Sequence, residues 1–438
     1  MSVTTFLHSV TAKLIVVAIL TAMLFVPLAM VWALVGERAN RRDEVVHDVG
    51  AVWGARQTIG GVALSIPFDI VTGSGATETR VTSRMTVLPK TLDIQAVLTP
   101  EVRRRSIFEV MLYRTRITAT GTFVPPDVSR LGVAPSMVHW PDAALLVGVS
   151  DLRGVGALVS TSWGSAAIEM EPAADPTPFA SGLRGVAPIS ASDPVAFRIE
   201  IELAGSGALM FLPSGEQTRV TLQSTWHSPS FTGALLPSAH TIDASGFKAE
   251  WQSNFLSRPF PQVWLNSAMA PQSLDGKLAS ATFGADLVTP VDHYRQTERA
   301  VKYGFLFIVL TFSVFLVWET VEKLRLHPVQ YLFVGLALVV FYLLLLSVSE
   351  QVSFVTAYVV ASIATVGLVS GYAARVLGGA RSGLGIAGSV GTLYALLFVL
   401  LSLEDLALLV GSVAVFLALA VVMYLTRGIN WYGEAETR

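Results

Sequence analysis

The chain has 438 residues, of which 52% are hydrophobic and only 14% charged, and its mean hydropathy is +0.58. Soluble domains carry about 25% charged residues, so this composition indicates a membrane protein. The formal net charge of −2 provides no bulk field for nucleic acid, and the absence of cysteine excludes disulfides, thiolate catalysis and cysteine-ligated metals.

Six apolar runs predict six membrane helices, since spanning a bilayer core takes roughly 20 apolar residues. The first run, residues 14–36, contains Pro27 and is too long for the apolar core of a cleaved signal peptide, so we expect a retained helix. The other five are residues 304–318, 329–348, 354–372, 384–403 and 406–426. Their short connections predict antiparallel neighbours in one bundle.

Lys and Arg in the short loops predict the orientation, because such residues concentrate on the cytoplasmic side. The basic loop residues are Lys323, Arg325, Arg375, Arg381 and Arg427. The alternate loops, at residues 350–351 and 404–405, contain neither Lys nor Arg. Both termini are therefore expected in the cytoplasm, although Arg38, Arg41 and Arg42 disagree with this orientation.

The long segment between the first and second helices has a β pattern. RVTSRMTVL, KTLDIQAVL and AFRIEIEL alternate in character and are separated by clusters of Gly, Pro, Ser and Asp. We expect a membrane α-helical bundle of six transmembrane helices plus a large, mainly antiparallel, sandwich-like β domain in the periplasm. The expected divisions are a cytoplasmic N-terminus 1–13, helix 14–36, periplasmic domain 37–301, five-helix bundle 302–427 and cytoplasmic tail 428–438.

Two ordered sets of short motifs allow an internal duplication of the β domain. Residues 61–67, 79–82, 96–100 and 106–110 match residues 207–213, 218–221, 234–237 and 245–249. A duplication predicts two similar subdomains related by pseudo-symmetry. The alternative is that alternating strands resemble one another by construction.

The sequence contains no strong catalytic or metal-binding motif. HExxH, P-loop and GxSxG patterns are absent, and the seven histidines have no metal-ligand spacing on one element. Gly383, Gly385 and Gly388 form GxGxxG, but they open a membrane helix rather than a βαβ unit. We therefore predict no catalytic residue, no cofactor and no metal.

Charged residues at the outer ends of the bundle are the candidate site. The acidic members, on two hairpin tips, are Glu350, Glu404 and Asp405, and the basic members, near the start of the second helix, are Arg295, Arg299 and Lys302. Pairing between them would dock the β domain on the bundle, or they would carry protons or cations. The simpler interpretation is that hairpin tips require polar residues.

Five long stretches carry a resemblance to a known family. They are ERANRRDEVVHDVGAVWGARQTIGGVALSIPF, WHSPSFTGALLPSAHTIDASGFKAEW, PVDHYRQTERAVKYGFLFIVLTF, HPVQYLFVGLALVVFYLLLLSVSE and LEDLALLVGSVAVFLALAVVMYLTRGINWY. With these motifs the sequence resembles the CreD (Cet) inner-membrane protein family. Residues 125–195 contribute no recognisable motif to that resemblance.

The resemblance implies a bacterial inner-membrane protein that supports cell-envelope integrity and the envelope-stress response, within a two-component regulon. It brings no catalytic residues to this sequence. We expect periplasmic binding of a ligand or protein partner without catalysis, with the lipid bilayer as a further partner and no nucleic acid. The alternatives are a transporter or lipid-handling protein and an envelope enzyme that acts on glycans.

Overall fold

The chain divides into two compact units, each of which is described by itself. The computed structural model describes residues 10–72, 79–173, 179, 181–266, 271–288, 293–322, 326–377, 379–403 and 406–427. The β unit comprises Asp43–Pro290, and the helical unit comprises Met1–Arg42 with Val291–Arg438. Helix α2 (Val10–Trp53) contributes residues to both units.

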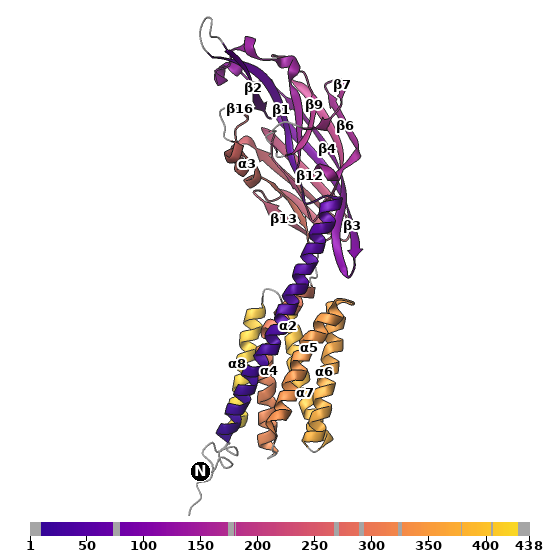
Figure 1. The fold of residues 1–438 in the computed structure, drawn as a ribbon, viewed down its shortest axis with the longest axis vertical. Helices are drawn as coiled ribbons and strands as arrows, with labels where there is room; N and C mark the ends of the chain where they lie inside the picture. The colour runs from indigo at the N-terminus through magenta and orange to yellow at the C-terminus, as the bar shows by residue number, and fades with distance from the viewer. Residues whose placement is uncertain are drawn as a thin grey trace, which may run out of the picture. The chain divides into compact units, whose positions relative to one another are not determined.

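The helical unit is built from long apolar helices (Figure 1). Besides α2, they are α4 (His293–Val321), α5 (Pro328–Ser349), α6 (Phe354–Val376), α7 (Ala380–Ser402) and α8 (Ala407–Thr426). Five of them, α2 and α4 to α7, are long and apolar enough to cross a membrane. The sixth expected span corresponds to α8, whose apolar stretch Ala407–Val421 is shorter among the described residues.

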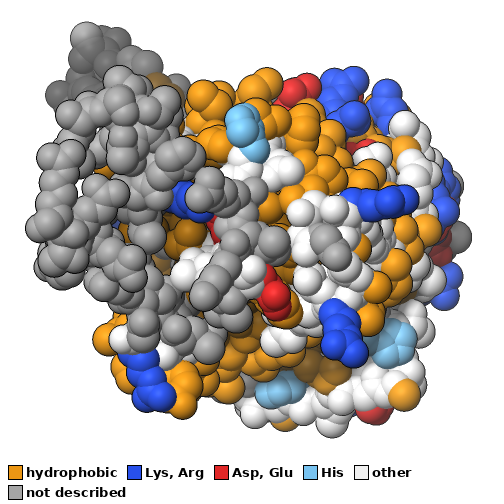
Figure 2. All heavy atoms as spheres, turned by 90° about the horizontal axis from the view of Figure 1, so that it is seen from below, with side chains coloured by type: hydrophobic (Ala, Val, Ile, Leu, Met, Phe, Trp, Pro, Cys, Tyr) orange, Lys and Arg blue, Asp and Glu red, His pale blue; other side chains and the backbone are white. Residues whose placement is uncertain are grey.

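The surface of these helices is suited to lipid. Between 22% and 50% of the most apolar window of each of the five helices is buried within the protein, so at least half of each window needs another apolar covering. Hydrophobic side chains occupy much of the surface visible in Figure 2, with Lys and Arg side chains scattered among them. The apolar helices therefore indicate association with a lipid bilayer.

Two short connections end in local caps that start the next helix. The Nδ1 of His327 accepts a hydrogen bond from the amide of Val329 at 3.3 Å, and the side chain of Gln330 accepts one from the amide of His327 at 2.8 Å. At α6, the hydroxyl of Ser353 accepts from the amide of Thr356 at 3.3 Å. These caps satisfy amides that the first helical turn leaves free, which fixes where α5 and α6 begin.

Helix α2 packs against α4 and α5 through glycines. A Cβ atom at Gly335 of α5 would lie 2.1 Å from a methyl group of Leu24, and one at Gly304 of α4 would lie 2.9 Å from a methyl group of Leu28. The missing side chains let the helix backbones approach closely.

The β unit consists of two sheets (Figure 1). One face of each sheet packs against the other sheet, and the opposite face points outward. Sheet A runs in the order β13-β17-β11-β1-β5-β9-β8, with β2 paired to β1 and β16 paired to β2. Its strands are β1 (Gln57–Thr72), β2 (Thr79–Val87), β5 (Ala144–Val149), β8 (Glu171–Pro172), β9 (Gly182–Val186), β11 (Ala208–Phe211), β13 (Pro229–Gly233), β16 (Val263–Leu265) and β17 (Phe283–Leu287).

Sheet B runs in the order β14-β15-β12-β3-β4-β10-β6-β7. Its strands are β3 (Thr91–Arg105), β4 (Phe108–Phe123), β6 (Val155–Trp163), β7 (Ala166–Ile168), β10 (Val195–Ser206), β12 (Gln217–Ser224), β14 (Ala239–Asp243) and β15 (Gly246–Asn254). The strand pairs described in the two sheets are antiparallel except β1 with β11 and β3 with β12. The β unit is therefore a mixed, mainly antiparallel sandwich.

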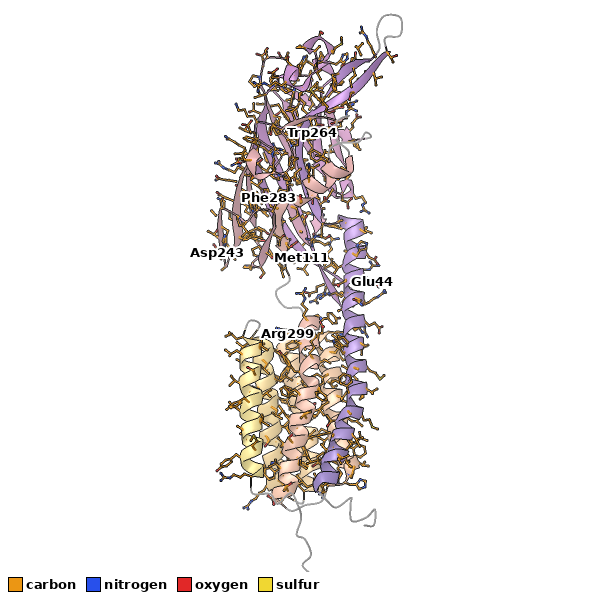
Figure 3. The ribbon with its side chains drawn as sticks, turned by 90° about the vertical axis from the view of Figure 1, so that its left-hand side faces the viewer. Glu44, Met111, Asp243, Trp264, Phe283 and Arg299 are labelled. Atoms are coloured by element: carbon orange, nitrogen blue, oxygen red, sulfur yellow. The ribbon has the colours of Figure 1, made fainter. Side chains whose placement is uncertain are left out.

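One hydrophobic core lies between the two sheets. Alternate residues of β3 (Leu92, Ile94, Ala96 and Leu98) are buried in it, as the period of two of a strand requires. Aromatic rings meet across the gap: Trp251 of sheet B and Phe283 of sheet A have ring centroids 5.7 Å apart. Figure 3 shows Phe283 within the layered strands.

The outer faces of the two sheets differ. Helix α3 (Pro271–Ser280) covers part of sheet A, where Leu274 and Leu278 pack with Ala63 and Leu146 in a second, smaller cluster. On sheet B, by contrast, the outward residues of β3 and β12 stay largely exposed. Sheet B thus presents a free face.

The chain passes from sheet B to sheet A within a single residue. Strand β10 ends at Ser206 and β11 begins at Ala208, and Gly207 between them has a φ of +70°, which favours glycine. The hydroxyl of Tyr113 in β4 donates a 2.6 Å hydrogen bond to the carbonyl of Ala208. Complete burial raises the pKa of Tyr113, so this hydroxyl stays protonated and ties the sheets together.

The two proposed repeats do not form separate subdomains. One TRVT motif lies in β2 of sheet A and the other in β12 of sheet B, whereas the matched segments in β1 and β11 both belong to sheet A. Strands from both halves pair directly, as β3 does with β12, and they share the single core. The β unit is one compact domain, and an internal duplication within it stays a prediction.

We expect Tyr113→Phe to destabilise the β unit by about 1–3 kcal/mol, because the Ala208 carbonyl would lose its buried donor. Hydrogen exchange of β4 and β11 amides in the full chain would measure the change. Tyr424→Phe is the control, since Tyr424 is 62% exposed on α8. Equal protection in both variants would contradict the role of the Tyr113 hydroxyl.

Candidate functional site

Among the predicted site residues, Glu350 joins three helices of the helical unit. The Tyr294 hydroxyl donates to its carboxylate at 3.0 Å, and the Nε of Arg38 lies 3.8 Å from the same oxygen. The guanidinium of Arg42 lies over the Tyr294 ring, 5.6 Å from its centroid. Glu350 at the end of α5 thus connects α2 and α4, whereas the sequence suggested Arg295, Arg299 or Lys302 as its partners.

Two of the three basic members of the predicted site contact a helix end and a neighbouring acid. The Nη2 of Arg299, labelled in Figure 3, donates to the carbonyls of Leu403 at 3.1 Å and Leu400 at 3.4 Å, where α7 ends. Lys302 forms an i,i+4 ion pair of 3.0 Å with Glu298. Arg295 lies one turn before Arg299 on α4. The remaining two acids, Glu404 and Asp405, lie outside the described residues.

A second carboxylate, Glu319, connects α2, α4 and α5 near their opposite ends. Its side chain is only 3% exposed. One oxygen accepts from the Nζ of Lys13 at 2.5 Å and from the amide of Leu326 at 2.9 Å, and the other accepts from the Tyr331 hydroxyl at 2.9 Å. We call these four residues the Glu319 cluster.

The Glu319 cluster escaped the sequence analysis, although a signal for it exists. Lys13 directly precedes the first apolar run, and Glu319 directly follows the second. Two helices of opposite direction bring these positions to the same depth, so an acid and a base there are natural partners. Both carboxylate oxygens of Glu319 accept hydrogen bonds, so the cluster links the three helices structurally, and we call such a link a staple.

Metal ligands and catalytic groups are sparse in the β unit. No group of three or more His, Asp or Glu residues in the described part of the chain could hold a metal ion. The Nε2 of His139 lies 3.2 Å from Asp69, and the pKa of Asp69 is lowered by a hydrogen bond from Thr82 and then by His139. This is a single His–Asp contact rather than a catalytic constellation.

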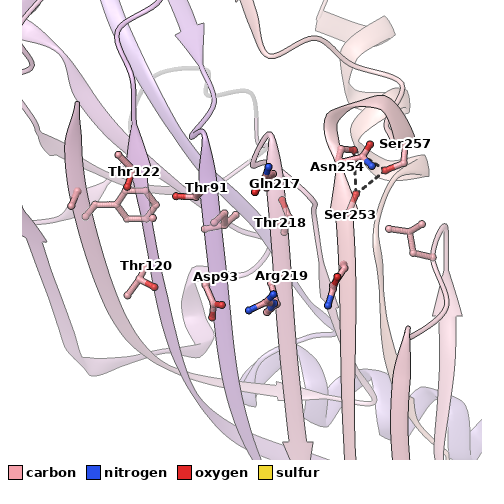
Figure 4. A pocket seen from close by; sticks show the side chains of 16 residues that line it. Thr91, Asp93, Thr120, Thr122, Gln217, Thr218, Arg219, Ser253, Asn254 and Ser257 are labelled. Atoms are coloured by element: carbon pink, nitrogen blue, oxygen red, sulfur yellow. Dashed lines mark hydrogen bonds between the residues drawn. The ribbon is translucent and has the colours of Figure 1, made fainter. Parts of the chain in front are cut away.

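The free face of sheet B holds a hollow of about 810 Å³. Strand register places its side chains in rows across β4, β3, β12 and β15. The first row is Thr122, Thr91, Gln217 and Asn254, and the second is Thr120, Asp93, Arg219 and Gln252. Figure 4 shows Thr120, Asp93 and Arg219 side by side on neighbouring strands.

One side of this hollow is closed by the chain that follows β15. Asn254 accepts a hydrogen bond from the amide of Leu256 at 3.0 Å, and the hydroxyls of Ser253 and Ser257 lie 2.9 Å apart (Figure 4). Leu235 adds an apolar side chain to the lining. The hydrogen bonds hold this turn in place, so the hollow is a built feature of the fold.

A smaller hollow of about 300 Å³ lies farther along the same strands. Its lining includes Val97 and Thr99 of β3, Gln223 of β12 and Lys248 of β15. These positions continue the alternation that places Thr91 and Asp93 outward.

Charges on the free face are compensated. Lys248 forms a 2.8 Å ion pair with Glu250 and lowers the pKa of that carboxyl group by its hydrogen bond. In the larger hollow, Asp93 and Arg219 face each other across β3 and β12. Asp93 is the one carboxylate in that lining, whereas glycoside hydrolysis commonly uses two. The lining is therefore suited to hydrogen bonding with a neutral polar ligand.

Comparison with known proteins identifies the family. The family model described as Inner membrane protein CreD matches residues 9–432. Inner membrane protein CreD of Escherichia coli (strain K12) is 32% identical over 424 residues, which cover 94% of this chain and 91% of that protein. The chain belongs to the CreD family. The resemblance drawn from the sequence motifs is thus confirmed, and the match spans the β unit and all of the helical unit except its first eight and last six residues.

We expect Lys13 and Glu319 to stabilise the helical unit jointly. In a double-mutant cycle of Lys13→Met and Glu319→Gln, the coupling should be roughly 1–3 kcal/mol, because the carboxylate is buried and its hydrogen bond is charge-assisted. Unfolding of the full chain in mixed detergent micelles would measure it.

The matched control is the exposed pair Glu298 and Lys302. The same substitutions there should couple by less than about 0.5 kcal/mol, because solvent screens the charges and the pair lies on one helix turn. Equal coupling at both pairs would show that the Glu319 cluster is not a staple.

Proposed function

We propose that this chain is a bacterial inner-membrane protein that supports cell-envelope integrity by binding a periplasmic ligand on the free face of sheet B, without catalysing a reaction. The observation that carries the proposal is the polar hollow of about 810 Å³ on a sheet face whose outward β3 and β12 residues are largely exposed. Membership of the CreD family supports the location, because the E. coli relative is named an inner membrane protein.

The proposed orientation has the β unit in the periplasm and both termini in the cytoplasm. It is supported by Arg375 in the last turn of α6, Arg381 at the start of α7 and Arg427 after α8. The connection between α5 and α6 carries Glu350 and Gln351 and no Lys or Arg. Basic residues favour the cytoplasmic side of a membrane. Lys323 and Arg325, which belong to the same pattern, lie outside the described residues.

In this proposal the helical unit anchors the β unit. Glu350 with Arg38 and Tyr294, and Glu319 with Lys13, fix α2 against α4 and α5. Because α2 continues as one helix to Trp53, the staples hold the segment that leads into β1. Glu350 is thus assigned to helix docking rather than to ion transport.

A transporter or lipid-handling protein is the second candidate, and Glu319 is the residue that favours it. Buried acids within helical bundles often belong to ion paths. Here both oxygens of Glu319 accept hydrogen bonds, and Lys13 balances its charge. A transport path needs a group that can release its partner, so this saturated pairing supports the anchoring role more strongly.

Filling the hollow should abolish the envelope function. We expect Thr120→Trp to fail to restore the barrier in a strain lacking this protein, because the indole would occupy the second row of the hollow. Leakage of a periplasmic reporter enzyme would measure the barrier, with membrane levels of the protein matched.

Val81→Trp is the control for an added indole. Val81 is 55% exposed on β2 of sheet A, away from the free face of sheet B, and its variant should restore the barrier as the unchanged chain does. Full restoration by Thr120→Trp would overturn the assignment of function to this hollow.

A further inference from the structure

The two hollows of sheet B lie in line along the same pair of strands. Strands β3 and β12 are parallel and in register from Thr91 opposite Gln217 to Leu98 opposite Ser224. The larger hollow includes the first residues of both strands, and the smaller hollow includes the last residues of β12 and Thr99 of β3. Eight residue steps separate Thr91 from Thr99, or about 26 Å at the rise of a strand.

Outward side chains bridge the space between the hollows. Gln95 of β3 lies opposite Thr221 of β12, and Thr118 of β4 and Glu250 of β15 complete that row. We call the outward residues of the two central strands the polar track. They are Thr91, Asp93, Gln95, Val97, Gln217, Arg219, Thr221 and Gln223.

The chemistry of the polar track is that of neutral hydrogen bonding. Five of its eight side chains are hydroxyls or amides, which both donate and accept. Asp93 and Arg219 balance each other within it, as Lys248 and Glu250 do along its flank. A polyanion would require an excess of Lys and Arg, and the track has none.

The track is equally unsuited to a peptide strand or a lipid chain. Both β3 and β12 are paired on each side, so their backbones have no free edge to which a peptide could add. The apolar side chains that the two hollows leave exposed or half-exposed are Ala196, Leu235 and Val97, which is too little to bury an acyl chain.

We infer that the polar track binds an extended neutral glycan that lies along β3 and β12, an assignment that rests on the proposed ligand-binding function. Sugar hydroxyls donate and accept hydrogen bonds, as the Thr, Gln and Asn side chains do. The methyl groups of the Thr side chains and of Val97 supply contacts for the apolar faces of sugar rings. The length of the track favours a chain of several sugars over a single one.

Binding of oligosaccharides of different length tests this inference. The full chain in nanodiscs would be titrated calorimetrically with linear di- and hexasaccharides of glucose and of N-acetylglucosamine. We expect a hexasaccharide of at least one series to bind about tenfold or more tightly than its disaccharide, because only the longer ligand reaches both hollows.

A substitution between the hollows separates a continuous track from two isolated sites. Gln95→Trp should lower hexasaccharide affinity to that of the disaccharide and leave disaccharide affinity unchanged, since Gln95 lines neither hollow. Val81→Trp on sheet A should change neither affinity.

The inference is overturned if no hexasaccharide binds saturably, if affinity is independent of length, or if dextran sulfate or an unstructured peptide binds more tightly than every hexasaccharide. These outcomes differ from failure of the proposed function. If Thr120→Trp fails to restore the envelope barrier and no glycan binds, the proposed function of the free face stands and only its assignment to a glycan is rejected.

Discussion

The free face of sheet B exists because of the hydrophobic core on its other side. In β3, the buried side chains are Leu92, Ile94, Ala96 and Leu98. Because side chains alternate between the two faces of a strand, those between them must point outward. A slip of one residue would place Asp93 in the core and Ile94 in solvent, which burial of a charge makes very unfavourable. The core therefore sets the register, and the register assembles the rows of polar side chains from four strands.

The helical unit is likewise stabilised by buried polar groups that require hydrogen-bond partners. A carboxylate removed from water needs hydrogen-bond donors, and Glu319 obtains them from α2, α5 and the chain before α5. At the other end, Glu350 obtains the Tyr294 hydroxyl and lies close to Arg38. Between these ends, Gly304 and Gly335 admit leucines of α2. Polar ends and small interior residues together specify one arrangement of these helices.

Much of the architecture could be predicted from local pattern. Apolar length indicated the five membrane-length helices, and the alternation in KTLDIQAVL and AFRIEIEL indicated strands with one buried face. Family membership followed from long motifs and was confirmed by the comparisons.

The candidate site was hidden from local pattern, because it depends on pairing between distant strands. Nothing near Asp93 shows that Arg219 lies opposite it, and the parallel pairing of β3 with β12 places it there. Arg38 was missed as a neighbour of Glu350 for a similar reason, since α2 lies far away in sequence. The motif comparison between the halves could not reveal their shared core, because that core depends on pairing between distant strands such as β3 and β12.

The pairing of β3 with β12 also shapes how the chain must fold. Strand β3 can form a hairpin with β4 early, because the two are consecutive in the sequence. Its other neighbour, β12, follows only after all the strands from β4 to β11. Until β12 is synthesised and docked, one edge of β3 has unpaired amides and carbonyls beside alternating apolar side chains. Such non-local pairing is slow, and an open edge can pair with another chain. The strand that completes the free face therefore also ends a period in which the nascent domain is vulnerable to aggregation.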